Sequence, residues 1–99
     1  MTREPWYHPA AERELDDAVE FYEAESADLA ATFFAEIEAN VELLCERPLL
    51  GSSGVAGTRR KVLQRFPYTL IYRVAESEIQ IFAVAHHRRK PGYWIPRVR

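Results

Sequence analysis

The sequence predicts an α+β domain in which a short N-terminal strand and an α-helical hairpin pack on a small antiparallel β-sheet. Two stretches with helical periodicity come first, at residues 9–25 and 26–47. Three runs of alternating apolar residues then occupy residues 58–65, 68–74 and 78–86. Helical segments followed by consecutive strands are typical of α+β domains and not of repeated βαβ units.

The composition is that of an ordinary globular domain. Apolar residues make up 47% of the chain and charged residues 28%, which argues against a disordered segment. No apolar run approaches the ~18 residues of a membrane span, and the polar start of the chain is unlike a signal peptide. Cys45 is the only cysteine, so we expect a cytoplasmic protein without an internal disulfide. The length of 99 residues predicts a single domain over residues 1–99.

Charge is divided unevenly along the chain. Residues 1–57 carry 13 acidic and 3 basic side chains, so their net charge is −10. Residues 58–99 carry 10 basic and 2 acidic side chains, so their net charge is +8. This division favours a basic working surface in the second half. The alternative is two solvated faces that partly neutralise each other.

The N-terminal half is predicted to form a short strand and two helices. Residues 4–8 precede Pro9, which favours extended backbone before it and suits the first turn of a helix. Ser26 is a good N-cap for the second helix. Two aromatic residues, Phe21 and Phe34, lie beside the apolar stripes of these helices. They either widen the buried face or form an apolar surface for a partner.

The C-terminal half predicts an antiparallel meander of three strands, with the first strand paired at an edge of the sheet. In residues 68–74, alternation places Tyr68 and Tyr72 on one face and Ile71 on the other. Residues 78–86 are apolar on both faces, as expected of a central strand. Simple alternation places four of their side chains on one face, namely Ile79, Ile81, Ala83 and Ala85.

Basic residues gather at both ends of this meander. One set lies on its first strand and another follows its last strand: Arg59, Arg60, Lys61, Arg65, Arg88, Arg89 and Lys90. In a meander the two sets can meet on one side, next to Tyr93 and Trp94. Such a surface could hold phosphates and stack bases, or it could hold an acidic protein. The alternative is a solvated, charge-protected sheet edge.

Little else in the sequence points to catalysis. His86 and His87 are adjacent on a strand and therefore point in opposite directions, so no metal or other cofactor is predicted. Either histidine could act as a general acid or base, because the pKa of histidine lies near neutrality, or it could be structural. No serine has the sequence surroundings of an activated nucleophile.

Four segments together resemble the RelE/ParE superfamily of bacterial toxins. They are HPAAEREL at residues 8–15, FYE at 21–23, RFPYTLIYRV at 65–74 and AVAHHRRKPGYW at 83–94. The resemblance covers roughly residues 6–94. It is greatest to the ParE side of the superfamily and to the plasmid-stabilisation proteins near it. The resemblance implies the toxin of a type II toxin–antitoxin pair.

This resemblance also implies the partners. We expect a ParE-like toxin that binds and inhibits DNA gyrase and is neutralised by a cognate, ParD-like antitoxin in a hetero-oligomer. The antitoxin of such pairs is often also a DNA-binding dimer. The alternatives are a RelE-like ribonuclease that cuts messenger RNA on the ribosome, and a degenerate member that binds only its antitoxin. Target contacts are expected from Arg60, Arg65, Arg88, Arg89, Lys90, Tyr93 and Trp94. Antitoxin contacts are expected from Phe21, Phe34 and Arg73.

The residues that the resemblance implies for a RelE-like ribonuclease are incompletely matched. Such enzymes use two lysines on the second strand and an arginine on the third, and here these positions hold Arg60, Val62 and Thr69. After the last strand the expected arginine is Arg89, whereas the expected tyrosine position holds Ile95. Losing one preorganised charge costs ~10²–10³ in rate, so the set argues against efficient RNA cleavage. Other branches of the superfamily replace this set with a histidine and a carboxylate, so His86 or His87 keeps the enzyme alternative open. The candidate catalytic residues of a ribonuclease would be Arg60, His87, Arg89 and Tyr93.

Overall fold

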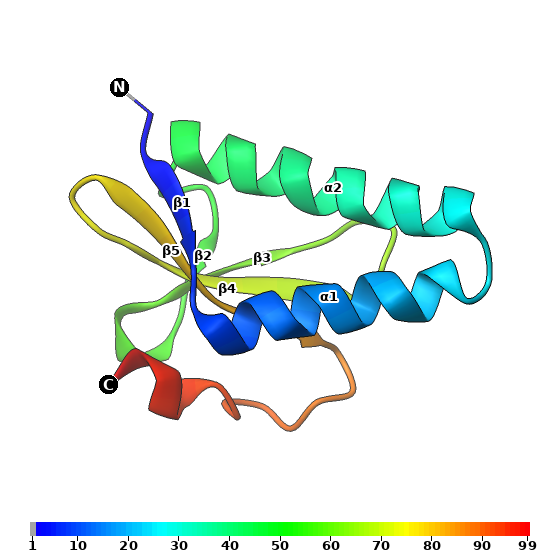
Figure 1. The fold of residues 1–99 in the computed structure, drawn as a ribbon. Helices are drawn as coiled ribbons and strands as arrows, with labels where there is room; N and C mark the ends of the chain where they lie inside the picture. The colour runs from blue at the N-terminus through cyan, green and yellow to red at the C-terminus, as the bar shows by residue number, and fades with distance from the viewer. Residues whose placement is uncertain (1) are drawn as a thin grey trace.

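Residues 2–99 are described by a computed structural model, in which two helices cover one face of a five-stranded sheet (Figure 1). The helices and strands follow one another as β1 (Glu4–Tyr7), α1 (Pro9–Glu23), α2 (Ala27–Glu46), β2 (Ser52–Ser53), β3 (Arg59–Val62), β4 (Tyr68–Val74) and β5 (Glu78–His86). Two short 3-10 turns, η1 (Val55–Gly57) and η2 (Ile95–Val98), complete the chain. The predicted α+β class is confirmed. Within residues 2–99, no helix has the length and apolar character needed to cross a membrane.

The strands are arranged in the order β1-β5-β4-β3-β2. The antiparallel meander of β3, β4 and β5 and the edge position of β1 are as predicted. Because β1 runs parallel to β5, the sheet is mixed and not purely antiparallel. The two-residue strand β2 lies at the other edge, where Ser52 pairs with Arg60. Sequence reasoning missed β2 because its serines resemble the surrounding loop.

A β-bulge in β5 changes which side chains face the helices. Ile71 pairs with Ala83 and the next residue, Tyr72, pairs with Ile81, so Phe82 is an extra residue on β5. As a result Ile81 and Val84 both face the helices, whereas Ala83 faces away. The predicted simple alternation along β5 is therefore wrong beyond Ile81, because a bulge shifts the side-chain period by one residue.

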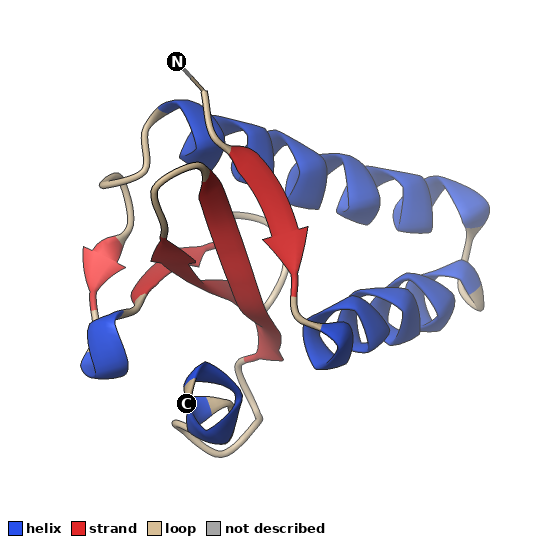
Figure 2. Ribbon diagram, turned by 60° about the vertical axis from the view of Figure 1, so that its left-hand side comes forward, coloured by secondary structure: helices blue, strands red, loops and turns tan. Residues whose placement is uncertain are grey.

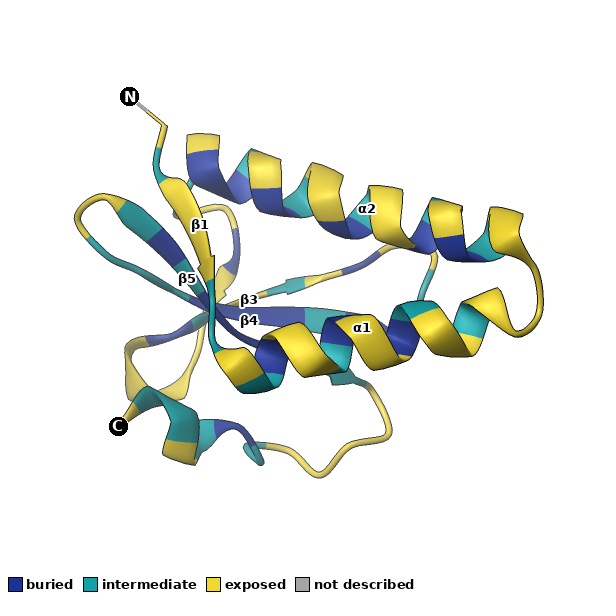
Figure 3. Cartoon of the chain, viewed as in Figure 1, coloured by how far each residue is buried: buried dark blue, intermediate teal, exposed yellow. Residues whose placement is uncertain are grey.

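The main core lies between the sheet and the helical hairpin (Figure 3). Buried positions recur along both helices at helical spacing: Ala11, Leu15, Ala18, Ala30, Phe33, Ile37, Val41 and Leu44. The hairpin is set by the predicted cap, since the Ser26 side chain accepts a hydrogen bond from the Leu29 N–H. Pro9 occupies the first turn of α1, as predicted. The helices thus leave only one sheet face for other contacts.

The C-terminal segment packs on the opposite face of the sheet. Trp94 is buried there against Ile71 and Ala83, and Ile95 and Val98 pack beside them. Figure 2 shows this final turn beneath the strands, on the side away from α2. It covers only part of that face, and the remainder is open.

Candidate functional site

A groove lies on the sheet face that the helices leave uncovered, and we call it the sheet groove. It runs from β3 across β4 to the segment after β5. The residues that matter for its chemistry are Arg60, Val62, Thr69, His87, Arg89, Lys90, Tyr93 and Trp94. The register explains this meeting, because Arg60 pairs with Ile71, and Val62 pairs with Thr69. Among residues 2–99, no acidic side chain lines the sheet groove.

The basic side chains of the sheet groove are held to different degrees. Arg60 and Lys90 are exposed, and neither forms an ion pair within the described chain. His87 is also exposed, and its Nε2 lies 3.0 Å from the Thr69 hydroxyl. Arg89 lies over the ring of Tyr93, with its guanidinium carbon 3.8 Å from the ring centroid. The sheet groove therefore offers free cationic donors beside one preoriented guanidinium.

Glu14 of α1 binds the residues behind Arg89. The Tyr93 hydroxyl donates a 2.7 Å hydrogen bond to Glu14, and the Arg97 guanidinium donates two more, of 3.0 and 2.9 Å. The Val84 N–H donates a fourth, of 3.0 Å. The Arg89 guanidinium lies farther away, with its Nη1 3.7 Å from a Glu14 oxygen. Glu14 thus ties α1, β5 and the C-terminal segment together.

These contacts determine the protonation of the cluster. Burial alone would raise the pKa of Glu14, but hydrogen bonds from Arg97, Tyr93 and the Val84 N–H outweigh it and lower that pKa. Burial and the hydrogen bond to Glu14 raise the pKa of Tyr93 well above its usual value. Tyr93 is therefore a neutral phenol that donates a hydrogen bond to a carboxylate, which is a poor arrangement for a general base.

The two histidines have different surroundings, as their adjacency predicts. His86 faces the helix side, where its ring lies 5.0 Å from the ring of Tyr68. Its Nδ1 accepts a hydrogen bond from the Arg88 N–H. Burial and the nearby Arg88 charge lower the pKa of His86, which favours the neutral ring. His87 lines the open face with Arg60 and Arg89, and His86 borders the same groove although its ring packs against Tyr68.

The other basic residues predicted for the target surface lie elsewhere. Arg65 forms an ion pair with Glu36 of α2, with Nε 3.3 Å from Oε1. Arg88 lines a separate hollow beside α1, together with Phe21. Trp94 lies at the bottom of the sheet groove and is only 8% exposed. Its ring packs in the core and is little available for stacking on a partner. The structure therefore brings together Arg60, Arg89, Lys90 and Tyr93, but not Arg65 or Arg88.

The residues predicted for antitoxin contact divide between two faces. Phe21 is 65% exposed on α1, and Phe34 is 39% exposed on α2. Both rings are thus available on the hairpin surface. Arg73 lies on the opposite sheet face, where it donates to the Val98 carbonyl oxygen and stacks on the ring of Phe82. Arg73 therefore holds the C-terminal segment and is separated from the two phenylalanines.

Sequence reasoning missed Glu14 and Arg97. In the sequence Glu14 resembles the other acidic residues of the first helix, although it directly precedes the buried Leu15. Its position beside the apolar stripe of the helix is the one sequence feature that could have indicated a partly buried carboxylate. Arg97 lies beyond the segments that carried the resemblance, and nothing in its neighbours predicts a partner 83 residues away.

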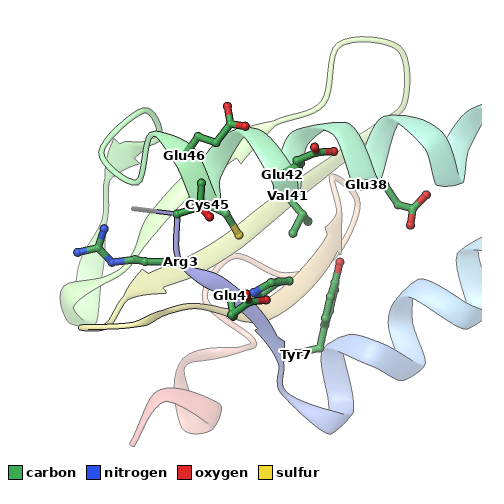
Figure 4. A pocket seen from close by; sticks show the side chains of 10 residues that line it. Arg3, Glu4, Tyr7, Glu38, Val41, Glu42, Cys45 and Glu46 are labelled. Carbon is green, nitrogen blue, oxygen red and sulfur yellow. The ribbon is translucent and has the colours of Figure 1, made fainter.

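A further hollow lies between β1 and the C-terminal half of α2 (Figure 4). Its rim carries four carboxylates and one guanidinium: Glu4, Glu38, Glu42, Glu46 and Arg3. Tyr7 and Cys45 point into it, and burial and Glu38 raise the pKa of Tyr7 to about 12. Cys45 is buried, as predicted. The negative rim makes this hollow unsuited to anionic ligands.

Comparisons with known proteins agree with the fold and its topology. Residues 7–91 match the family model described as the ParE toxin of the type II toxin–antitoxin system parDE. A protein of Sinorhizobium fredii, Y4kP, whose name describes it as a candidate toxin, is 35% identical over 81 residues, which are 80% of this chain and 83% of that protein. A structure of the chromosomal ParDE TA system from P. aeruginosa is similar with a TM-score of 0.73 and 25% identity. The match covers 86% of this chain and 96% of that one.

Proposed function

The chain belongs to the ParE toxin family of type II toxin–antitoxin systems, and on that premise we propose that it arrests growth by binding and inhibiting DNA gyrase in the cytoplasm. A cognate, ParD-like antitoxin neutralises it in a hetero-oligomer. The proposal treats the sheet groove as the target-binding surface and the helical hairpin as the antitoxin-binding surface.

One observation favours target binding over catalysis. The groove gathers exposed cations, but it lacks the groups that would complete a ribonuclease. Val62 and Thr69 stand at two positions where RelE-like enzymes carry cations. The remaining phenol, Tyr93, donates its hydroxyl to Glu14. A surface of this kind is suited to holding an anionic partner, and the Tyr93 hydroxyl is not free to act as a general base.

The antitoxin surface is supported by exposure and charge. Phe21 and Phe34 are large apolar side chains left exposed on the hairpin, and such rings are typical anchors of protein interfaces. Residues 1–57 carry the net charge of −10, so a segment that covers the hairpin must tolerate or complement acidic side chains. An antitoxin segment bound to the hairpin does not itself cover the sheet groove. The groove would be blocked by another segment of the same antitoxin, or sterically by the rest of the complex.

The decisive experiment is induction of the chain alone in bacteria, followed by assays of both candidate targets. A gyrase inhibitor is expected to reduce supercoiling by purified gyrase, to induce the DNA-damage response and to leave transcripts intact. Prompt arrest of translation with cleaved messenger RNA would instead reject the gyrase proposal. Normal growth with abundant folded protein would identify a member that only binds its antitoxin.

A ribosome-dependent ribonuclease remains the second candidate because of one observation. Arg60, His87 and Arg89 do meet in the sheet groove, and together they could stabilise charge on a phosphate and move a proton. The substitution His87→Ala distinguishes the ribonuclease from the gyrase inhibitor. This substitution should abolish arrest if His87 transfers a proton, and it should change arrest little if the groove only binds its target.

A further inference from the structure

We infer that the sheet groove binds the phosphodiester backbone of DNA, so that the toxin contacts the DNA that gyrase holds as well as the enzyme. This inference rests on the proposed function, because it identifies the ligand of the same site. The observation that supports it is the convergence of Arg60, Arg89 and Lys90 in a groove whose lining within residues 2–99 includes no carboxylate. Arg60 and Lys90 form no ion pair there, whereas Arg89 pairs at 3.7 Å with Glu14, which lies behind it.

The donors of the groove match the oxygens of a phosphate. Arg60 is exposed on β3 without an ion pair in the described chain, so its guanidinium is free for a bidentate contact. Arg89 is already oriented by the ring of Tyr93, and this stacking lowers the entropy lost when it binds. The Thr69 hydroxyl and the His87 ring, 3.0 Å apart, add further polar groups to the lining of the groove.

The charged side chains that line the sheet groove are all basic, which favours nucleic acid over a protein partner. Protein interfaces are depleted of lysine, and their centres are depleted of charge, whereas protein–DNA interfaces are strongly positive. The acids of the chain lie mostly on α1 and α2, which cover the other face of the sheet. An approaching polyanion is therefore repelled by the hairpin and attracted to the groove, so the charge asymmetry orients the molecule.

Two features favour DNA over RNA as the source of the phosphates. The groups that would deprotonate a 2′-hydroxyl and stabilise charge on the phosphate it attacks are incomplete, since Tyr93 is bound to Glu14 and Thr69 replaces a cation. The proposed target also carries duplex DNA. Contacts to the sugar–phosphate backbone need no base sequence, so the binding should be non-specific and strongly dependent on salt.

The test is fluorescence anisotropy of a short labelled duplex with purified toxin, measured across salt concentrations. We expect a dissociation constant of roughly 10⁻⁶–10⁻⁴ M and a log–log salt slope of about −2.7 for three cationic contacts. Between about 50 and 200 mM salt, the affinity of the wild type should fall roughly 40-fold. Arg60→Gln and Lys90→Gln should each reduce the slope by about 1, so that their affinity falls only roughly 12-fold.

The matched control is Arg47→Gln, which removes another exposed charge, at the end of α2 and outside the groove. It should leave the salt slope unchanged, and thermal unfolding of all three variants should match the wild type. Equal slopes for the groove variants and the wild type would overturn the inference. Tighter binding of single-stranded RNA would assign the groove to RNA, and tighter binding of polyglutamate would assign it to an acidic protein.

Supercoiling assays with the same variants separate this inference from the proposed function. If the groove variants lose DNA binding but inhibit gyrase fully, the DNA contact has no role and the inference fails, while the gyrase proposal stands. If the wild type binds duplex DNA through Arg60 and Lys90 but does not inhibit gyrase, the proposed function fails and the groove assignment stands.

Discussion

The carboxylate of Glu14 and the guanidinium of Arg97 face each other in a bidentate pair, with N–O distances of 3.0 and 2.9 Å. They meet at the edge of β5, beyond the point where β1 ends opposite Ile81. There Glu14 accepts from the Val84 N–H, and Arg97 donates to the Phe82 carbonyl oxygen. The pair therefore satisfies backbone groups that would otherwise be unpaired at a strand edge.

Replacing Glu14 should destabilise the whole domain. Glu14→Gln removes the charge that pairs with Arg97 and places an amide donor where only donors face it. Both side chains are mostly buried, so we expect the free energy of unfolding to fall by about 2–4 kcal/mol. Urea unfolding measures this, with Glu20→Gln on the exposed face of α1 as the control. Equal stability of the two variants would contradict a structural role for the pair.

The same pair predicts how stability depends on pH. Burial opposes ionisation of Glu14, but its hydrogen bonds lower its pKa below the ordinary 4.5. A lowered pKa stabilises the fold above 4.5, and this contribution is lost as the pH falls through the folded-state pKa. Unfolding curves between about pH 3 and pH 7 should show the wild type and Glu14→Gln converging on the acid side. A constant difference across that range would mean that Glu14 does not titrate as the geometry requires.

The fold was largely predictable because its signals are local. Alternation bounded by Pro67 and by the short link before Glu78 predicted β4 and β5 residue for residue. β3 is shorter than predicted, ending at Val62, because Leu63 turns into the core. The bulge at Phe82 was not predictable, since no glycine or proline marks it, and it results from fitting β5 to its neighbours.

The site was less predictable because partners distant in sequence decide which charges are free. The basic residues were evident from the sequence, but their ion pairs were not. Glu36 binds Arg65 and Glu14 binds Arg97, and both pairs join residues far apart in the chain. Only the fold shows that Arg60 remains available. Local sequence patterns report residue type and periodicity, whereas pairing of this kind depends on tertiary packing.

Removing the Tyr93 hydroxyl should separate a structural role from a chemical one. Tyr93→Phe loses one hydrogen bond to Glu14 but keeps the ring that supports Arg89. We expect a loss of about 1 kcal/mol in unfolding free energy and unchanged growth arrest on induction. Tyr22→Phe, in the aromatic core, is the control for loss of a phenol. Abolished arrest at wild-type stability would show that the Tyr93 hydroxyl takes part in chemistry.

Charge on the exposed hairpin should weaken antitoxin binding without unfolding the toxin. Phe21 is 65% exposed, so Phe21→Asp should change the unfolding free energy by less than about 1 kcal/mol. If its ring anchors the antitoxin, affinity measured by calorimetry should fall at least ~10-fold. Leu49→Asp is matched in exposure, at 68%, and lies outside the hairpin. Unchanged affinity of the Phe21 variant would assign this ring to packing alone.

Gly51 is required by a close approach between the loop and Tyr72. A Cβ at this position would lie 2.6 Å from the Tyr72 hydroxyl and 2.7 Å from the Arg60 carbonyl oxygen. That hydroxyl also accepts from the Gly51 N–H and donates to the Pro48 carbonyl. Gly51→Ala should therefore cost about 1–3 kcal/mol in thermal or urea unfolding. Gly54→Ala should cost little, because its nearest neighbour would lie at 3.4 Å. Equally small losses for both variants would show that the loop adapts to the added methyl group.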